Sequence, residues 1–112
     1  MEMIATEMGG HMKVALTGRL DTAAVDQIET ALVARVVPRG LNALIDLSKV
    51  EFIGSMGVRM LISTARALGR KKAKLVLFAP QDGVREVFDV VSLADIIPIC
   101  ADEAEAVAAL QA

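Results

Sequence analysis

The first forty residues show a strand pattern that gives way to a helical one. An apolar stretch from Met12 to Leu16, ended by Thr17-Gly18, predicts a β-strand. We expect it to pair with an earlier strand near residues 3–8 across the turn Gly9-Gly10-His11. These residues therefore form a predicted N-terminal β-hairpin.

A helical period follows the hairpin. Asp21-Thr22 offers an N-cap, because a short polar side chain there can accept a hydrogen bond from an N–H group of the first turn. Pro38-Arg39-Gly40 ends the apolar period. The apolar positions between these signals are Val25, Ile28, Leu32 and Val36. This spacing predicts a first amphipathic helix.

The middle of the chain predicts a buried strand and a second helix. Leu44 to Leu47, leading toward Phe52-Ile53, is nearly continuous in apolar residues, as in a strand covered on both faces. A helix is predicted over residues 56–68, and Gly69 followed by Arg70-Lys71-Lys72 supplies its C-terminal stop. The apolar positions of this helix are Val58, Leu61, Ile62, Ala65 and Leu68.

Two more strands and two more helices are predicted after residue 74. Leu75 to Phe78 is expected to be a buried strand, and Pro80 to open a third helix. The apolar positions of that helix are Val84, Val87, Phe88 and Val91. Ile96 to Ile99 predicts a last strand, which Pro98 places at a sheet edge because proline has no N–H to donate. Asp102, three residues before Glu105, then predicts the start of a fourth helix through residues 104–110.

This order of elements predicts the fold class. Strands that alternate with helices after a hairpin indicate an α/β fold with a mixed β-sheet and about four packed α-helices. A length of 112 residues fits a single domain over residues 1–112. We expect five side chains to be largely buried around the sheet: Ile45, Leu47, Leu75, Leu77 and Val87.

Composition narrows the class of protein. Hydrophobic residues make up 54% of the chain and charged residues 23%, as in globular domains. No apolar run reaches the length of a membrane span and no signal segment is visible, so we expect a cytoplasmic protein without membrane insertion. The lone Cys100 predicts neither a disulfide nor a metal site. A net charge of −2, without tryptophan or tyrosine, argues against direct binding of nucleic acid.

The sequence offers no convincing set of catalytic residues. The single histidine, His11, lies in the predicted turn, and Asp46 and Glu51 are expected to be solvated acids at a strand end. The stretch Gly54 to Gly57 lacks the G-x-S-x-G spacing of a nucleophile elbow, and no histidine follows Ser55 to act as its base. We predict a non-enzymatic protein with no cofactor.

Ser55, at a strand-to-helix junction between Gly54 and Gly57, has two interpretations. It can be a plain N-cap whose oxygen accepts a backbone hydrogen bond. It can also be a phosphorylation site, because no acidic residue occupies the first turn after it, where a phosphate would meet free N–H groups and the positive end of the helix dipole. The residues alone leave both interpretations open.

Several stretches together resemble one family. They are residues 16–21 (LTGRLD), residues 44–53 (LIDLSKVEFI), Ser55 with Gly57, and the stretch from Ala79-Pro80 through residues 84–88 to residues 97–99. Over nearly the whole chain they resemble the STAS domain, which is named for sulfate transporters and anti-sigma-factor antagonists. Within that family the chain is most similar to the small antagonists of bacterial partner-switching pathways.

The resemblance implies a STAS fold and a phosphorylation switch. It implies that Ser55 is phosphorylated by an anti-sigma factor, which is also a serine kinase with a histidine-kinase-like ATPase fold. The unphosphorylated antagonist binds this kinase, phosphorylation releases it, and a metal-dependent serine phosphatase restores it. Gly54 replaces the acid and Met56 the second hydroxyl residue of the family's loop.

We expect one surface to contact the partner. It comprises Asp21, Thr22, Gly54, Ser55, Met56, Gly57, Val58 and Arg59. The alternative is a constitutive STAS scaffold subunit, docked on a protein such as a transporter ATPase, in which Ser55 acts only as an N-cap.

Overall fold

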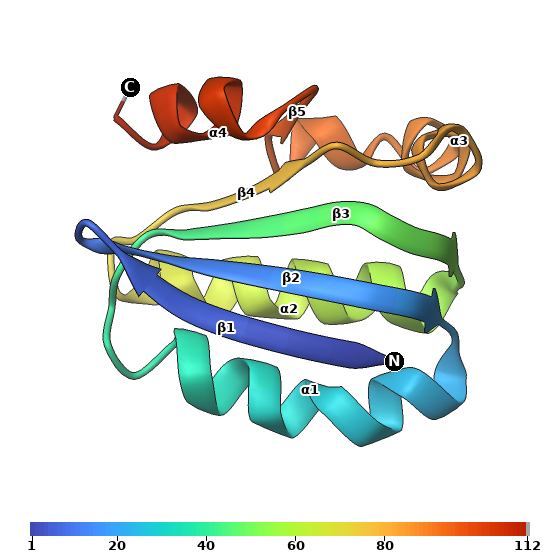
Figure 1. Cartoon of the computed structure of the whole chain (residues 1–112), viewed down its shortest axis with the longest axis horizontal. Helices are drawn as coiled ribbons and strands as arrows, with labels where there is room; N and C mark the ends of the chain where they lie inside the picture. The colour runs from blue at the N-terminus through green and yellow to red at the C-terminus, as the bar shows by residue number, and fades with distance from the viewer. Residues whose placement is uncertain (112) are drawn as a thin grey trace.

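The computed structural model describes residues 1–111. One five-stranded sheet has the order β1-β2-β3-β4-β5, with β1 antiparallel to β2 and the other pairs parallel (Figure 1). The strands are β1 Glu2–Met8, β2 His11–Leu20, β3 Ala43–Ile53, β4 Leu75–Phe78 and β5 Ile99–Cys100. The helices are α1 Thr22–Val36, α2 Ser55–Arg70, α3 Asp82–Val90 and α4 Glu103–Leu110, with a 3₁₀ turn at Leu93–Asp95. The predicted α/β fold with a mixed sheet and four α-helices is confirmed.

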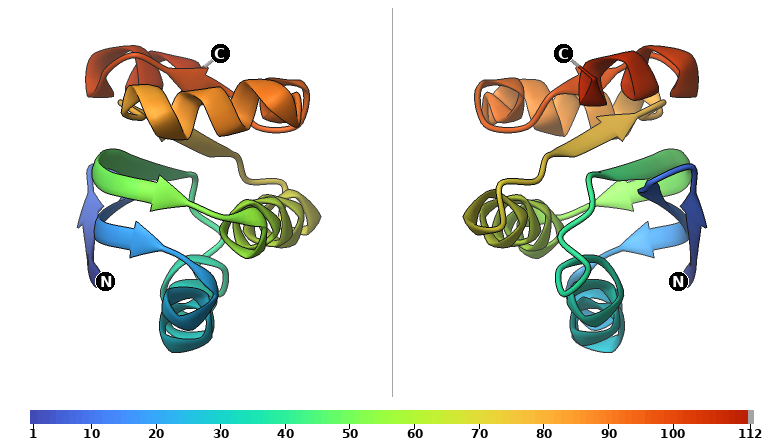
Figure 2. Two further views of the ribbon diagram at one scale, coloured as in Figure 1. Left: turned by 90° about the vertical axis from the view of Figure 1, so that its right-hand side faces the viewer. Right: turned by 90° about the vertical axis from the view of Figure 1, so that its left-hand side faces the viewer.

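The sheet has helices on both faces. Neighbouring residues of a strand point to opposite faces, and Ile45 joins the main core while Leu44 joins a smaller one. The main core lies under α1 and α2 and also receives Val84 and Phe88 of α3. The smaller core packs the opposite face against α4 (Figure 2). Four of the five side chains predicted to be buried are at most 4% exposed, whereas Val87 is only half-buried at the rim of the core.

The hairpin is confirmed, but its second strand is longer than predicted. β2 starts at His11, which pairs with Met8, so the turn consists of Gly9 and Gly10 alone. β2 then passes Gly18 and ends only at Leu20. Gly18 has a φ of +118°, and the pairing with β3 shifts register immediately after it, where Glu51 of β3 is left without a partner in β2. The prediction that Thr17-Gly18 ends the strand was wrong.

Three other boundaries also differ from prediction. α2 continues through Gly69, where the predicted stop begins, to Arg70, and Lys72, with a φ of 61°, makes the left-handed turn after the helix. α3 begins at Asp82 rather than at Pro80. β5 is an edge strand as predicted, but it consists of Ile99 and Cys100 only, and Ile97 packs in the main core before it. The Pro98 carbonyl still joins the sheet by accepting a hydrogen bond from the Leu77 N–H at 3.0 Å.

Two caps agree with the sequence. The carboxylates of Asp21 and Asp102 accept hydrogen bonds, each 2.9 Å long, from the N–H groups of Ala24 and Glu105, at the starts of α1 and α4. Within residues 1–111, no helix combines the length and the apolar character needed to cross a bilayer.

Candidate functional site

The site predicted from the sequence lies where β2 and β3 end. These strands are parallel and pair Leu20 with Ile53, so the chain segments that follow them emerge side by side. The Gly54 N–H donates a hydrogen bond to the Leu20 carbonyl at 3.1 Å, which ties the two strand ends together. As a result α1 and α2 start at the same edge of the sheet (Figure 2, left). The structure therefore brings Asp21-Thr22 next to Gly54-Ser55.

Ser55 is not the N-cap of α2. The N-cap is Gly54, in an extended conformation, and no side chain caps this helix. Ser55 is instead the first residue of the helix and is exposed. The interpretation of Ser55 as a plain N-cap was therefore wrong, because its side chain caps nothing and the residue is exposed. The first turn of α2 holds no acidic residue.

Gly57 and Val58 face the interior. A Cβ atom on Gly57 would lie 2.8 Å from Ile53 Cγ1, 2.9 Å from Leu20 Cγ and 3.0 Å from the Leu20 carbonyl oxygen. Only glycine lets the start of α2 approach the sheet this closely. Val58 is 6% exposed. Both residues were predicted to belong to the partner-binding surface, but both are buried and belong to the packing that fixes Ser55 in place.

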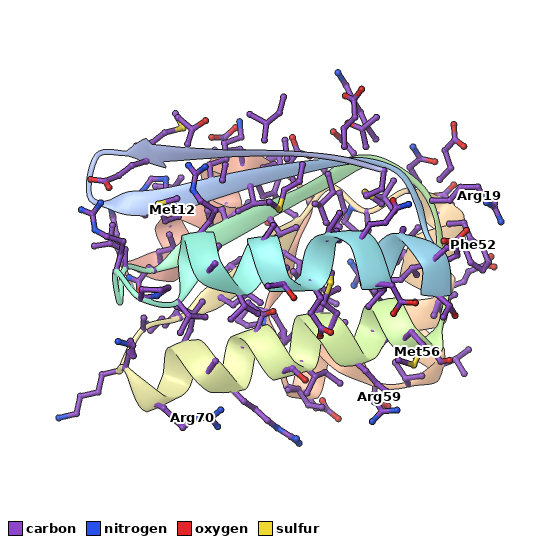
Figure 3. All side chains as sticks on the ribbon, turned by 90° about the horizontal axis from the view of Figure 1, so that it is seen from below. Met12, Arg19, Phe52, Met56, Arg59 and Arg70 are labelled. Atoms are coloured by element: carbon purple, nitrogen blue, oxygen red, sulfur yellow. The ribbon has the colours of Figure 1, made fainter. Side chains whose placement is uncertain are left out.

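The exposed part of the predicted surface consists of Thr22, Ser55 and Arg59, with Asp21, Gly54 and Met56 half-buried beside them. The Arg59 Nη1 atom lies 4.0 Å from the Met56 sulfur. Figure 3 shows Met56 and Arg59 at the same end of the molecule as Arg19 and Phe52.

Arg19 and Phe52 extend this surface, and neither was among the predicted site residues. The Arg19 guanidinium lies 4.5 Å from the centre of the Phe52 ring, as in a cation–π interaction, and Phe52 is 39% exposed. The two residues are paired across β2 and β3 after the register shift at Gly18. Because strand alternation is broken there, the sequence carried no signal that Phe52 faces solvent.

The remaining reactive groups lie away from Ser55. His11 is half-buried at the opposite end of β2, and its Nε2 atom has no hydrogen-bond partner. Burial, followed by the charges of Glu105 and Asp102, raises the pKa of the Cys100 thiol, so this cysteine is not activated as a nucleophile. Within residues 1–111, no cluster of three or more histidine, cysteine, aspartate or glutamate residues is arranged to hold a metal ion.

Comparisons with known proteins agree with this architecture. A family model described as the STAS domain matches residues 2–106. Over 109 residues the chain is 30% identical to BtrV of Bordetella bronchiseptica, whose name assigns it provisionally to the anti-sigma factor antagonists. This similarity covers 97% of this chain and 93% of BtrV.

Solved structures show the same fold. The crystal structure of an anti-sigma factor antagonist from Mycobacterium paratuberculosis matches with a TM-score of 0.86 and 25% identity, over 99% of this chain and 94% of that one. The unphosphorylated form of the anti-sigma factor antagonist SpoIIAA, from Bacillus, matches with a TM-score of 0.78 and 22% identity, over 98% and 96% of the two chains.

Proposed function

The chain belongs to the STAS domain family, and from that premise we propose that it is an anti-sigma factor antagonist controlled by phosphorylation of Ser55. In its unphosphorylated form it binds an anti-sigma factor that is also a serine kinase of the histidine-kinase-like ATPase fold. Phosphorylation ends this binding, and a metal-dependent serine phosphatase reverses the modification. The chain itself catalyses no reaction.

One observation carries this proposal: Ser55 is exposed, and its side chain does not cap α2. A kinase can reach it without opening the helix. In the transfer step the Ser55 oxygen attacks the γ-phosphorus of ATP, and the bond from that phosphorus to the β–γ bridging oxygen breaks. The hydroxyl proton passes to a base of the kinase, and ADP leaves. The names of BtrV and of the mycobacterial protein support the same role.

The physics of the switch follows from the position of the phosphate. Phosphorylation adds about −1.5 to −2 charges at neutral pH. At the first turn of α2 this charge meets the positive end of the helix dipole, and Arg59 lies four residues further along, so the protein remains folded. A partner surface that fits a neutral hydroxyl would instead have to bury a dianion without a prepared cation, which costs several kcal/mol. Phosphorylation therefore destabilises the complex with the partner and not the fold of the protein.

Intact-mass measurement with ATP and candidate kinases encoded beside the protein tests the modification. Wild type should gain one phosphate and Ser55→Ala none. In calorimetric titration with the same kinase, Ser55→Ala should bind like the unphosphorylated wild type, and Ser55→Asp about tenfold more weakly or worse, which is about 1.4 kcal/mol. Melting curves should remain close to wild type for both variants.

The same titration separates the switch from the scaffold alternative. A scaffold subunit needs no modification, so Ser55→Asp would bind its partner as wild type does. If Ser55→Asp stays folded and binds with unchanged affinity, the switch is refuted and the scaffold function takes its place. Reproducible turnover by the protein alone, lost in Ser55→Ala, would contradict the absence of catalysis.

A further inference from the structure

The outer face of α2 carries three arginines and no acidic residue. Within this helix the only charged residues are Arg59, Arg66 and Arg70, which we call the arginine stripe; no aspartate or glutamate is present. Ser55 and the three arginines are separated by four, seven and four residues, spacings that keep side chains on one face of a helix. The stripe thus starts one turn from Ser55 and extends for about 16 Å between its first and last arginine.

The arginine stripe is exposed and has no acidic partner. All three side chains are exposed, and no ion pair within residues 1–111 involves them, whereas Arg39 and Arg85 pair with Glu7 and Asp89. Between Arg59 and Arg66 lies a shallow hollow of about 230 Å³, also lined by Ile62 and Ser63. This concentration of positive charge is unusual because the protein as a whole has a net charge of −2.

We propose that the arginine stripe is a docking surface for an acidic surface of the anti-sigma factor, adjoining the Ser55 contact. This inference rests on the proposed function for the identity of the partner. Arginine and methionine are enriched in protein interfaces, and here Met56 and the half-buried Ile62 flank the arginines. A stripe of one sign on an otherwise acidic protein orients an acidic partner and speeds its association.

Two other anionic partners fit the stripe less well. Single-stranded nucleic acid needs aromatic side chains for stacking, and α2 has none. Binding to a membrane surface requires a helix with an exposed apolar face. Four large apolar residues of α2 are instead at most 6% exposed: Val58, Met60, Leu61 and Leu68. The other two, Met56 and Ile62, are half-buried and pack against the core. A folded acidic protein surface requires neither feature.

The stripe also bears on regulation. A phosphate on Ser55 would lie one helical turn from Arg59, close enough for the two to pair. Arg59 would then be withdrawn from the acidic partner at the moment when the phosphate itself opposes binding. Phosphorylation would thus weaken the Ser55 contact and the nearest part of the stripe together, leaving Arg66 and Arg70 unchanged.

The test compares Arg66→Glu with Arg35→Glu in stopped-flow association with the kinase that modifies Ser55. Arg35 is a matched control: it is also an exposed helical arginine, but it reaches away from α2 to the Ala5 carbonyl, 3.1 Å away. Both variants change the net charge equally. We expect Arg66→Glu to slow association about tenfold at low ionic strength and far less in high salt, and Arg35→Glu to slow it less than about twofold. Arg66→Gln should give a smaller effect in the same direction, which keeps the test valid if the reversal unfolds the protein.

Equal effects of Arg66→Glu and Arg35→Glu would overturn the proposal. The proposal would also be overturned if Arg66→Glu weakened binding to phosphatidylserine vesicles or to a DNA oligonucleotide but did not change the rate of association with the kinase. If Ser55→Asp loses binding but Arg66→Glu associates as fast as wild type, the docking surface is refuted and the phosphorylation switch stands. If Arg66→Glu slows association but Ser55→Asp binds like wild type, only the switch is refuted. If no candidate kinase binds, the proposed function fails. Binding of a synthetic glutamate-rich peptide then tests the arginine stripe by itself. The stripe is refuted if Arg66→Glu does not weaken binding of this peptide.

Discussion

The starts of α1 and α2 lie side by side at the same sheet edge but are held by different means. At α1 the Asp21 carboxylate accepts a hydrogen bond from the Ala24 N–H, so a polar side chain fixes the helix. At α2 no side chain plays this part, and Gly57 instead lets the helix backbone pack directly on Leu20 and Ile53. Fixing a helix through its buried side leaves the exposed side chains of its first turn free. Ser55 can therefore be rigidly placed and still be chemically available.

Gly57→Ala is the substitution most damaging to the way in which α2 is held. The added methyl group would lie 3.0 Å or less from Leu20 and Ile53, and one of the contacts is the Leu20 carbonyl, which already accepts from the Gly54 N–H. We expect a net loss of about 2 kcal/mol in the free energy of unfolding, because overpacking outweighs the better helix propensity of alanine. Urea denaturation measures this loss.

Gly69→Ala is the matched control in the same helix. No atom lies within 4 Å of a Cβ at Gly69, so alanine there should stabilise the protein by about 0.5–1 kcal/mol. Equal effects of Gly57→Ala and Gly69→Ala would mean that close packing does not hold the start of α2.

A smaller difference should separate the two polar residues at these helix starts. Asp21→Ala removes the cap of α1 and should lower the free energy of unfolding by about 1 kcal/mol. Ser55→Ala removes no cap and should change it by less than about 0.5 kcal/mol. Urea denaturation curves of both variants, recorded under identical conditions, measure the two changes in the free energy of unfolding. A loss in Ser55→Ala as large as that in Asp21→Ala would show that the serine hydroxyl does cap α2.

Signals confined to a few neighbouring residues predicted much of this fold. Asp21 and Asp102 were identified as caps because the donor that each accepts from lies three residues away. The apolar period of 25–36 likewise placed the buried face of α1. Such features need no knowledge of the rest of the molecule, since the interacting groups belong to one turn of helix.

Features that depend on distant parts of the chain were missed. Gly18 was interpreted as a strand end, because only the pairing with β3 keeps the chain in the sheet beyond it. Val58 was assigned to the contact surface, since the depth of α2 against the sheet depends on Gly57 meeting Leu20, 37 positions earlier in the sequence. Ser55 was considered as a cap because the sequence does not fix the first residue of a helix to within one position.

The smallest expected effect comes from Gly54→Asp, which would give α2 the kind of cap that α1 has. Gly54 has an extended backbone that any residue adopts, and a Cβ there would meet only the Phe52 ring, at 3.5 Å. We expect a gain of a few tenths of a kcal/mol in urea denaturation, with a similar gain for the uncharged Gly54→Asn. In Ser55-phosphorylated protein only the Gly54→Asp gain should shrink, because its carboxylate lies beside the phosphate. A loss of stability in both variants would show that the start of α2 has no room for a capping side chain and does not differ from α1 in the way described.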